Sequence, residues 1–147
     1  MKLILLAACE KVIQDAETRA ISLITIMTRA EVRDAVIQGA SAVEKMPPNA
    51  ILPMTWSVVA LLTPTPGDIG PLFTQQIEVF WPNGDLFVKG SLPFKFTDTR
   101  AHPNITNFIG FPGGQHGDVT IHLWIELDGT RTPGQDFQYS INVIHPS

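Results

Sequence analysis

The chain has 147 residues, of which 44% are hydrophobic and 16% are charged, and its net charge is −4 at pH 7. This composition supplies enough apolar side chains for a packed core and excludes a disordered chain. The ten Lys and Arg residues are scattered along the sequence, so no basic stripe is available for phosphates, which argues against nucleic-acid binding. We expect a single domain over residues 1–147.

The first apolar segment contains the single cysteine of the chain, Cys9. One cysteine excludes an intrachain disulfide and fits a reducing compartment. Residues 6–9 match a lipoprotein cleavage box, but the apolar run before Cys9 covers residues 3–8 and is shorter than the roughly 7–15 residues of a secretory signal. No other segment approaches the ~18 apolar residues of a membrane span. We therefore interpret the segment as a first β-strand and expect a cytoplasmic protein without membrane contact.

The next elements are a pair of strands and a segment with two interpretations. Residues 3–13 and 20–28 are apolar on both faces, as in strands that are covered on each side. In residues 28–46, Thr28 and Glu31 have the spacing of a capping box, and an apolar stripe roughly follows the helical period. We predict a short helix over 28–46, and the alternative is an irregular hairpin.

The link between residues 77–81 and 86–96 allows two hairpin registers. A two-residue turn pairs Val79 with Val88, apolar with apolar, whereas a three-residue turn led by a proline pairs Phe80 with Leu86. Because a slip of one residue inverts every side chain, we choose the first register on its hydrophobic pattern.

The remaining strands are predicted from alternation. Apolar side chains occupy every second position in residues 119–127 and 137–143, which indicates half-buried strands. Residues 56–62 and, more weakly, 105–111 are also strand-like. About eight strands with spread turn residues predict a mainly β fold, a two-sheet antiparallel β-sandwich that is immunoglobulin-like or jelly-roll-like.

Residues that bear reactive groups do not form a known motif. The four histidines lack the spacing of metal ligands, no nucleophile motif is present, and the glycine-rich segment 111–118 lacks the spacing of a phosphate loop. We therefore predict no catalytic residue, no metal and no cofactor. If a small ligand binds, His116 and Asp118 in this segment are the candidates, because sites concentrate on loops held by a rigid scaffold.

Aromatic residues on polar strand faces are the candidates for a partner surface. In the chosen register Phe80 faces Phe87 on the side away from the core, and Trp124 lies on the polar face of its strand. We predict that the three form an exposed patch, which often marks a partner surface. The alternative is that residues 28–46 or a long loop cover them.

Several segments together carry a family resemblance. They are residues 3–13 leading into 21–24, Leu52-Pro53-Met54, the strand that begins at residues 117–119, and Asp128-Gly129. On these the chain resembles a loosely defined bacterial family of small single-domain proteins of unknown function. The resemblance implies a β-sandwich and implies no site residues.

We therefore expect a non-enzymatic binding or assembly module that acts through a sheet face or edge. Its partner would be another protein or a second copy, for example in a larger particle such as a phage virion. The alternative is a small-molecule-binding sandwich with a pocket near residues 111–118.

Overall fold

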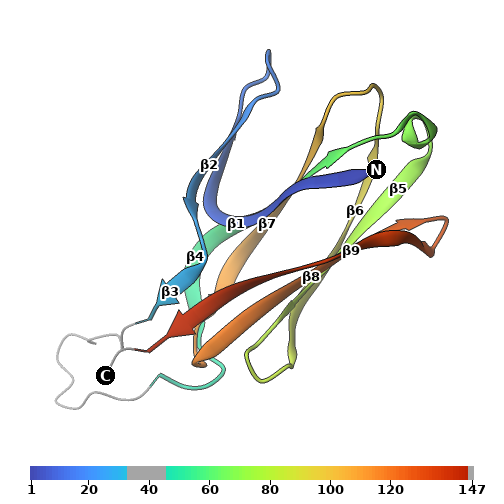
Figure 1. Ribbon diagram of the computed structural model, residues 1–147. Helices are drawn as coiled ribbons and strands as arrows, with labels where there is room; N and C mark the ends of the chain where they lie inside the picture. The colour runs from blue at the N-terminus through green and yellow to red at the C-terminus, as the bar shows by residue number, and fades with distance from the viewer. Residues whose placement is uncertain (33–45, 146–147) are drawn as a thin grey trace, which may run out of the picture.

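The computed structural model describes residues 1–32 and 46–145, which form two β-sheets packed face to face (Figure 1). Sheet A has the order β2-β1-β4-β7, and sheet B has the order β3-β9-β8-β5-β6. The strands of the described residues are β1 (Lys2–Gln14), β2 (Ile21–Ile26), β3 (Arg29–Glu31), β4 (Ile51–Thr63), β5 (Leu72–Phe80), β6 (Leu86–Lys95), β7 (His102–Pro112), β8 (Gly117–Leu127) and β9 (Thr130–Ile144). The predicted mainly β sandwich is confirmed.

All neighbouring strands are antiparallel except β3, which runs parallel to β9. This pair corrects the helix predicted over 28–46 at its start, because Arg29–Glu31 is extended and pairs with residues 142–144 of β9. The rest of that prediction lies largely outside the described residues. In the described part of the chain, the helical element is the single 3₁₀ turn η1 (Pro66–Asp68), and no helix there is a candidate for crossing a membrane.

The core lies between the inward faces of the two sheets. In β8 the odd positions 119–125 are fully buried, as their alternation predicts. Trp56 of β4 is the largest fully buried side chain. Its ring stacks on Phe108 with the centroids 4.6 Å apart, and its Nε1 donates a hydrogen bond to the Gly110 carbonyl at 2.8 Å. The indole therefore has both an apolar contact and a partner for its N–H group, which a buried tryptophan requires.

The β5–β6 hairpin combines the two registers that the sequence allowed. Val79 pairs with Val88 and Phe80 pairs with Leu86, with a register shift between the two pairs. The Gly84 N–H donates to the Trp81 carbonyl at 2.9 Å, and Gly84 has a φ of 93°, a conformation that glycine adopts at little cost. The proline-led turn therefore forms, and a bulge restores the apolar valine pair beyond it. Choosing one register for the whole hairpin was wrong.

The segment that joins β7 to β8 is packed tightly against the residues before β4. Gly113 and Gly114 are both buried. A Cβ atom added to Gly114 would lie 2.7 Å from the Ala50 nitrogen and 2.8 Å from the Pro48 carbonyl oxygen, and it would clash with the Pro47 carbonyl oxygen. Because these neighbours are backbone atoms, they cannot rotate away.

We predict that Gly114→Ala lowers the free energy of unfolding by about 1–3 kcal/mol, the usual cost of overpacking. Urea denaturation monitored by tryptophan fluorescence measures it. Gly67→Ala is the matched control, because a Cβ there meets nothing within 4 Å. Equal stability of the two variants would contradict the packing described for this segment.

Candidate functional site

Trp124 lies on the face of sheet B that points away from the core, but it is only 8% exposed. The Arg131 guanidinium lies 4.3 Å from the centre of its ring, and its Nε1 donates to Glu126 Oε1 at 3.0 Å. Arg131 also pairs with Asp136 at 3.1 Å, and His122 Nε2 lies 2.6 Å from Asp136 Oδ1. Polar neighbours on β8 and β9 therefore cover the tryptophan, and its predicted exposure is wrong.

Phe80 and Phe87 do not share a surface with each other. Phe80 lies opposite Leu86 because of the bulge. Phe87 packs against the core and contacts the edge of the Trp81 ring, with the centroids 5.4 Å apart. Both phenylalanines are half-buried. The three aromatic residues therefore do not form the exposed patch that the sequence predicted.

His116 and Asp118 are exposed at the start of β8. Asp118 Oδ1 accepts a hydrogen bond from Asn142 Nδ2 at 2.9 Å, and the ring of His116 lies 6.4 Å from that of His145. In the described residues, no three His, Cys, Asp or Glu side chains are grouped as they would be to hold a metal ion. These contacts connect the start of β8 to the end of β9. They do not bring several ligand-binding side chains together.

The face of sheet A that points away from the core is here called the outer A face. Its side chains are less charged than those around Trp124 on sheet B. Its side chains come from positions of β1, β4 and β7 that alternate with the core positions. The cross-strand rows are Leu5–Leu61–Pro103, Ala7–Val59–Ile105, Cys9–Ser57–Asn107 and Thr55–Ile109. These four rows contain no charged residue. Ala7, Cys9 and Val59 are buried although they lie outside the core cluster.

Strand β1 separates from β4 beside this face. Its pairing with β4 stops at Cys9 and Ser57, and the following residues pair with β2. The resulting hairpin, residues 10–26, is here called the arm. Figure 1 shows that it extends toward the end of the molecule where β6 connects to β7. There Arg19 Nη1 lies 3.3 Å from Asp98 Oδ2.

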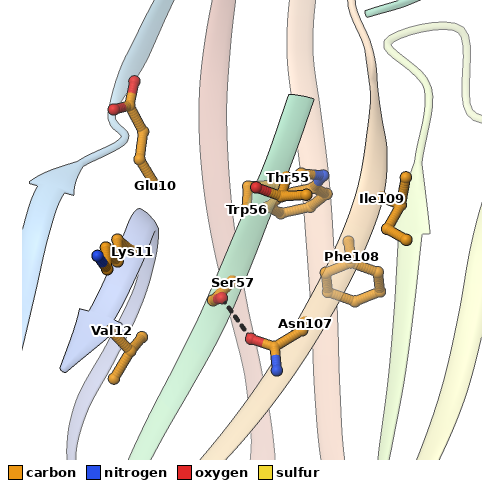
Figure 2. A pocket seen from close by; sticks show the side chains of 9 residues that line it. All are labelled: Glu10, Lys11, Val12, Thr55, Trp56, Ser57, Asn107, Phe108 and Ile109. Carbon is orange, nitrogen blue, oxygen red and sulfur yellow. Dashed lines mark hydrogen bonds between the residues drawn. The ribbon is translucent and has the colours of Figure 1, made fainter. Parts of the chain in front are cut away.

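A cavity of about 300 Å³ lies where the arm separates from β4 (Figure 2). Residues of three strands line it, namely Glu10, Lys11 and Val12 of β1, Thr55, Trp56 and Ser57 of β4, and Asn107, Phe108 and Ile109 of β7. Ser57 Oγ of β4 donates a hydrogen bond to Asn107 Oδ1 of β7 at 2.6 Å. No lining residue comes from segment 111–118, so the cavity is not at the predicted place.

Exposed isoleucines surround this region. Ile109 is 90% exposed, and Ile51 near it is 56% exposed. On the arm, Ile24 and Ile26 are 42% and 52% exposed, so residues 20–28 are not covered on both sides as predicted. The sequence signal for this surface was the apolar character of both faces of residues 3–13. Alternation alone does not determine which of the two faces stays exposed.

The chain matches no protein-family model, and no curated protein is significantly similar to it. The resemblance to a bacterial family of unknown function stays a prediction. Function is therefore argued from the geometry of the outer A face.

The arm tip and its partner Asp98 lie near a half-buried histidine, His102, at the start of β7. Burial lowers the pKa of His102 below its ordinary value of 6.5, and the positive charge of Arg19 acts in the same direction. The ring stacks on Phe94 with the centroids 5.8 Å apart. Contacts with a phenylalanine ring and a nearby cation both favour the neutral imidazole.

We predict that protonation of His102 destabilises the fold. Because its pKa is lower in the folded state than in the unfolded state, the stabilisation is complete above pH 6.5 and is lost as the pH falls below that value. Chemical denaturation between about pH 7.5 and about pH 5.5 should show a smaller loss of stability in His102→Phe than in the unsubstituted chain. Parallel pH profiles of the two proteins would contradict this assignment.

Proposed function

We propose that this protein is a non-enzymatic binding or assembly module that engages another protein through the outer A face and the adjoining edge strand β7. The observation that supports it most is the contrast between the two outward faces. On sheet B an outward tryptophan is covered by charged side chains, whereas on sheet A Ile109 is 90% exposed in one of four uncharged rows. A highly exposed apolar side chain on an uncharged face is costly in water, and such surfaces often mark a partner surface.

A protein partner fits this surface better than a small polar ligand. The exposed isoleucines lie on both sides of the cavity, on the arm and on β7, so they span more than one ligand pocket. An uncharged centre with polar groups at its margin matches the core and rim of protein interfaces. Lys11 and Glu10 of the arm provide such polar groups at the cavity.

A small-molecule-binding role is the second candidate, and the cavity beside the arm favours it. Its volume of about 300 Å³ is at the lower end of the range of ligand sites. The lining offers apolar walls and the hydroxyl and amide of Ser57 and Asn107. This candidate moves the predicted pocket from segment 111–118 to the arm.

The wider role that we propose is structural, as a component of a larger particle such as a phage virion. An assembly module needs partner surfaces and no reactive centre, which is consistent with the chemistry of the outer A face. The location that we propose is cytoplasmic or virion-associated. The free thiol of Cys9, which is buried, is compatible with a reducing compartment.

We predict that Ile109→Lys weakens partner binding by about tenfold or more. A tenfold change in Kd corresponds to ~1.4 kcal/mol of binding free energy, which is less than a central interface residue often contributes. The immobilised protein and its variants are exposed to extract from cells that contain it, and captured proteins are quantified by mass spectrometry. Leu72→Lys is the matched control, because Leu72 is 60% exposed but lies on β5 of sheet B. Equal capture by the unsubstituted chain and both variants would refute the proposed surface.

A further inference from the structure

We propose that the free edge of β7 pairs antiparallel with β7 of a second copy, which joins the two A sheets into one continuous sheet. The inference rests on the proposed function, because it names the partner of the outer A face. Its basis is the chemistry of the edge strands β7 and β6, the regularity of β7, and the register that a two-fold axis imposes.

The two long edge strands differ in how they are protected. In the described residues, β7 pairs with β4 on one side and β6 pairs with β5 on one side, and no strand pairs with the other edge of either. Strand β6 carries Lys89, Pro93 and Lys95, which are typical devices against edge-to-edge pairing. Residues 104–111 of β7 contain no charge and no proline. The prolines of β7, Pro103 and Pro112, lie near its two ends, so the central part of this edge lacks the features that keep strands apart.

The backbone of β7 is regular where pairing is proposed. Its residues from Pro103 to Ile109 pair one-to-one with Leu61 to Thr55 of β4, and the register shift of this strand pair lies beyond Ile109. A regular extended strand presents its outward N–H and C=O groups in the periodic pattern that a second strand needs. In the register argued below, residues 105–109 of one copy pair with 109–105 of the other, and about five residues is a common strand length in globular proteins.

A two-fold axis perpendicular to the sheet limits the possible registers. Paired residues lie on the same face of the sheet, so the axis passes midway between one residue and its own copy in the partner. A register is named below by that residue. With the axis at Asn107, Ile105 lies opposite the partner's Ile109 and Asn107 lies opposite its own copy. In the Thr106 register, Ile105 would lie opposite Asn107 and Ile109 would lie opposite Pro103. In the Phe108 register, Ile109 would lie opposite Asn107, and Ile105 would pair beyond the regular part of the strand. The Asn107 register thus pairs apolar with apolar on the outer A face.

The asparagine at the axis adds a polar contact to this register. Asn107 Oδ1 accepts a hydrogen bond from Ser57 Oγ at 2.6 Å, which orients the amide and leaves its NH₂ group to donate. A side-chain carbonyl oxygen has a second lone pair. The two amides at the axis can therefore donate to each other's oxygens, while Ile109, which is 90% exposed in one chain, becomes covered by Ile105 of the other.

We predict that Asn107→Cys forms a disulfide-linked dimer under mild oxidation, because directly opposed residues of antiparallel strands have Cα atoms about 4.5–5.5 Å apart, within disulfide range. Non-reducing electrophoresis of dilute protein measures the rate. Lys89→Cys on the β6 edge is the matched control, and Cys9 is retained because it is buried. Dimer formation at least about tenfold faster than in the control is expected, and equal rates would overturn the proposal.

A measurement without a new cysteine completes the test. Light scattering of the unsubstituted chain should give twice the chain mass of 16.1 kDa, and Ile109→Lys, at an exposed position, should return it to the mass of one chain. A single-chain mass for the unsubstituted protein at all concentrations would overturn self-pairing. If Ile109→Lys still abolished capture of another protein, the proposed function would stand with a different partner.

Discussion

The burial of one face of every strand between two sheets is the constraint on which the rest of the structure depends. Trp56 on β4 and the buried positions 119–125 of β8 meet in this interior. Because successive side chains of a strand point to opposite faces, burying these residues determines which residues point outward. The outer A face is therefore a direct consequence of the core, since Ser57 and Val59 are the neighbours of Trp56 and Val58.

The two outward faces differ in how their apolar side chains are shielded from water. On sheet B the outward Trp124 is removed from water by Arg131 above its ring and Glu126 at its N–H group, so the sandwich presents a polar surface there. On sheet A small residues are buried among their neighbours, but Ile109 has no such cover. A sandwich needs only one buried face on each sheet. An apolar outward face exposes apolar surface to water, which is unfavourable in the single chain and is relieved by contact with a partner.

The separation of β1 from β4 creates a cavity beside the outer A face. Beyond Cys9 the strand follows β2 and leaves a cavity between the arm and β4. The ion pair between Arg19 and Asp98 joins the arm tip to the loop between the sheets, and Arg100 donates the hydrogen bond that most lowers the pKa of Asp98, to about 2. The arm, the cavity and the β7 edge thus form one continuous region whose boundary is charged and whose centre is not.

The amino-acid sequence by itself determined the sandwich, because period-two alternation in residues 119–127 and 137–143 is compatible only with strands buried on one face. It also contained the apolar pattern that preserves the Val79–Val88 pair. Only the tertiary structure decided the rest. Whether Trp124 is exposed depends on Arg131 from another strand, whether Phe80 faces Phe87 depends on a bulge, and whether a cavity forms beside β4 depends on where β1 separates from it. Each of these depends on how neighbouring strands pair, which the periodicity of a single strand does not encode.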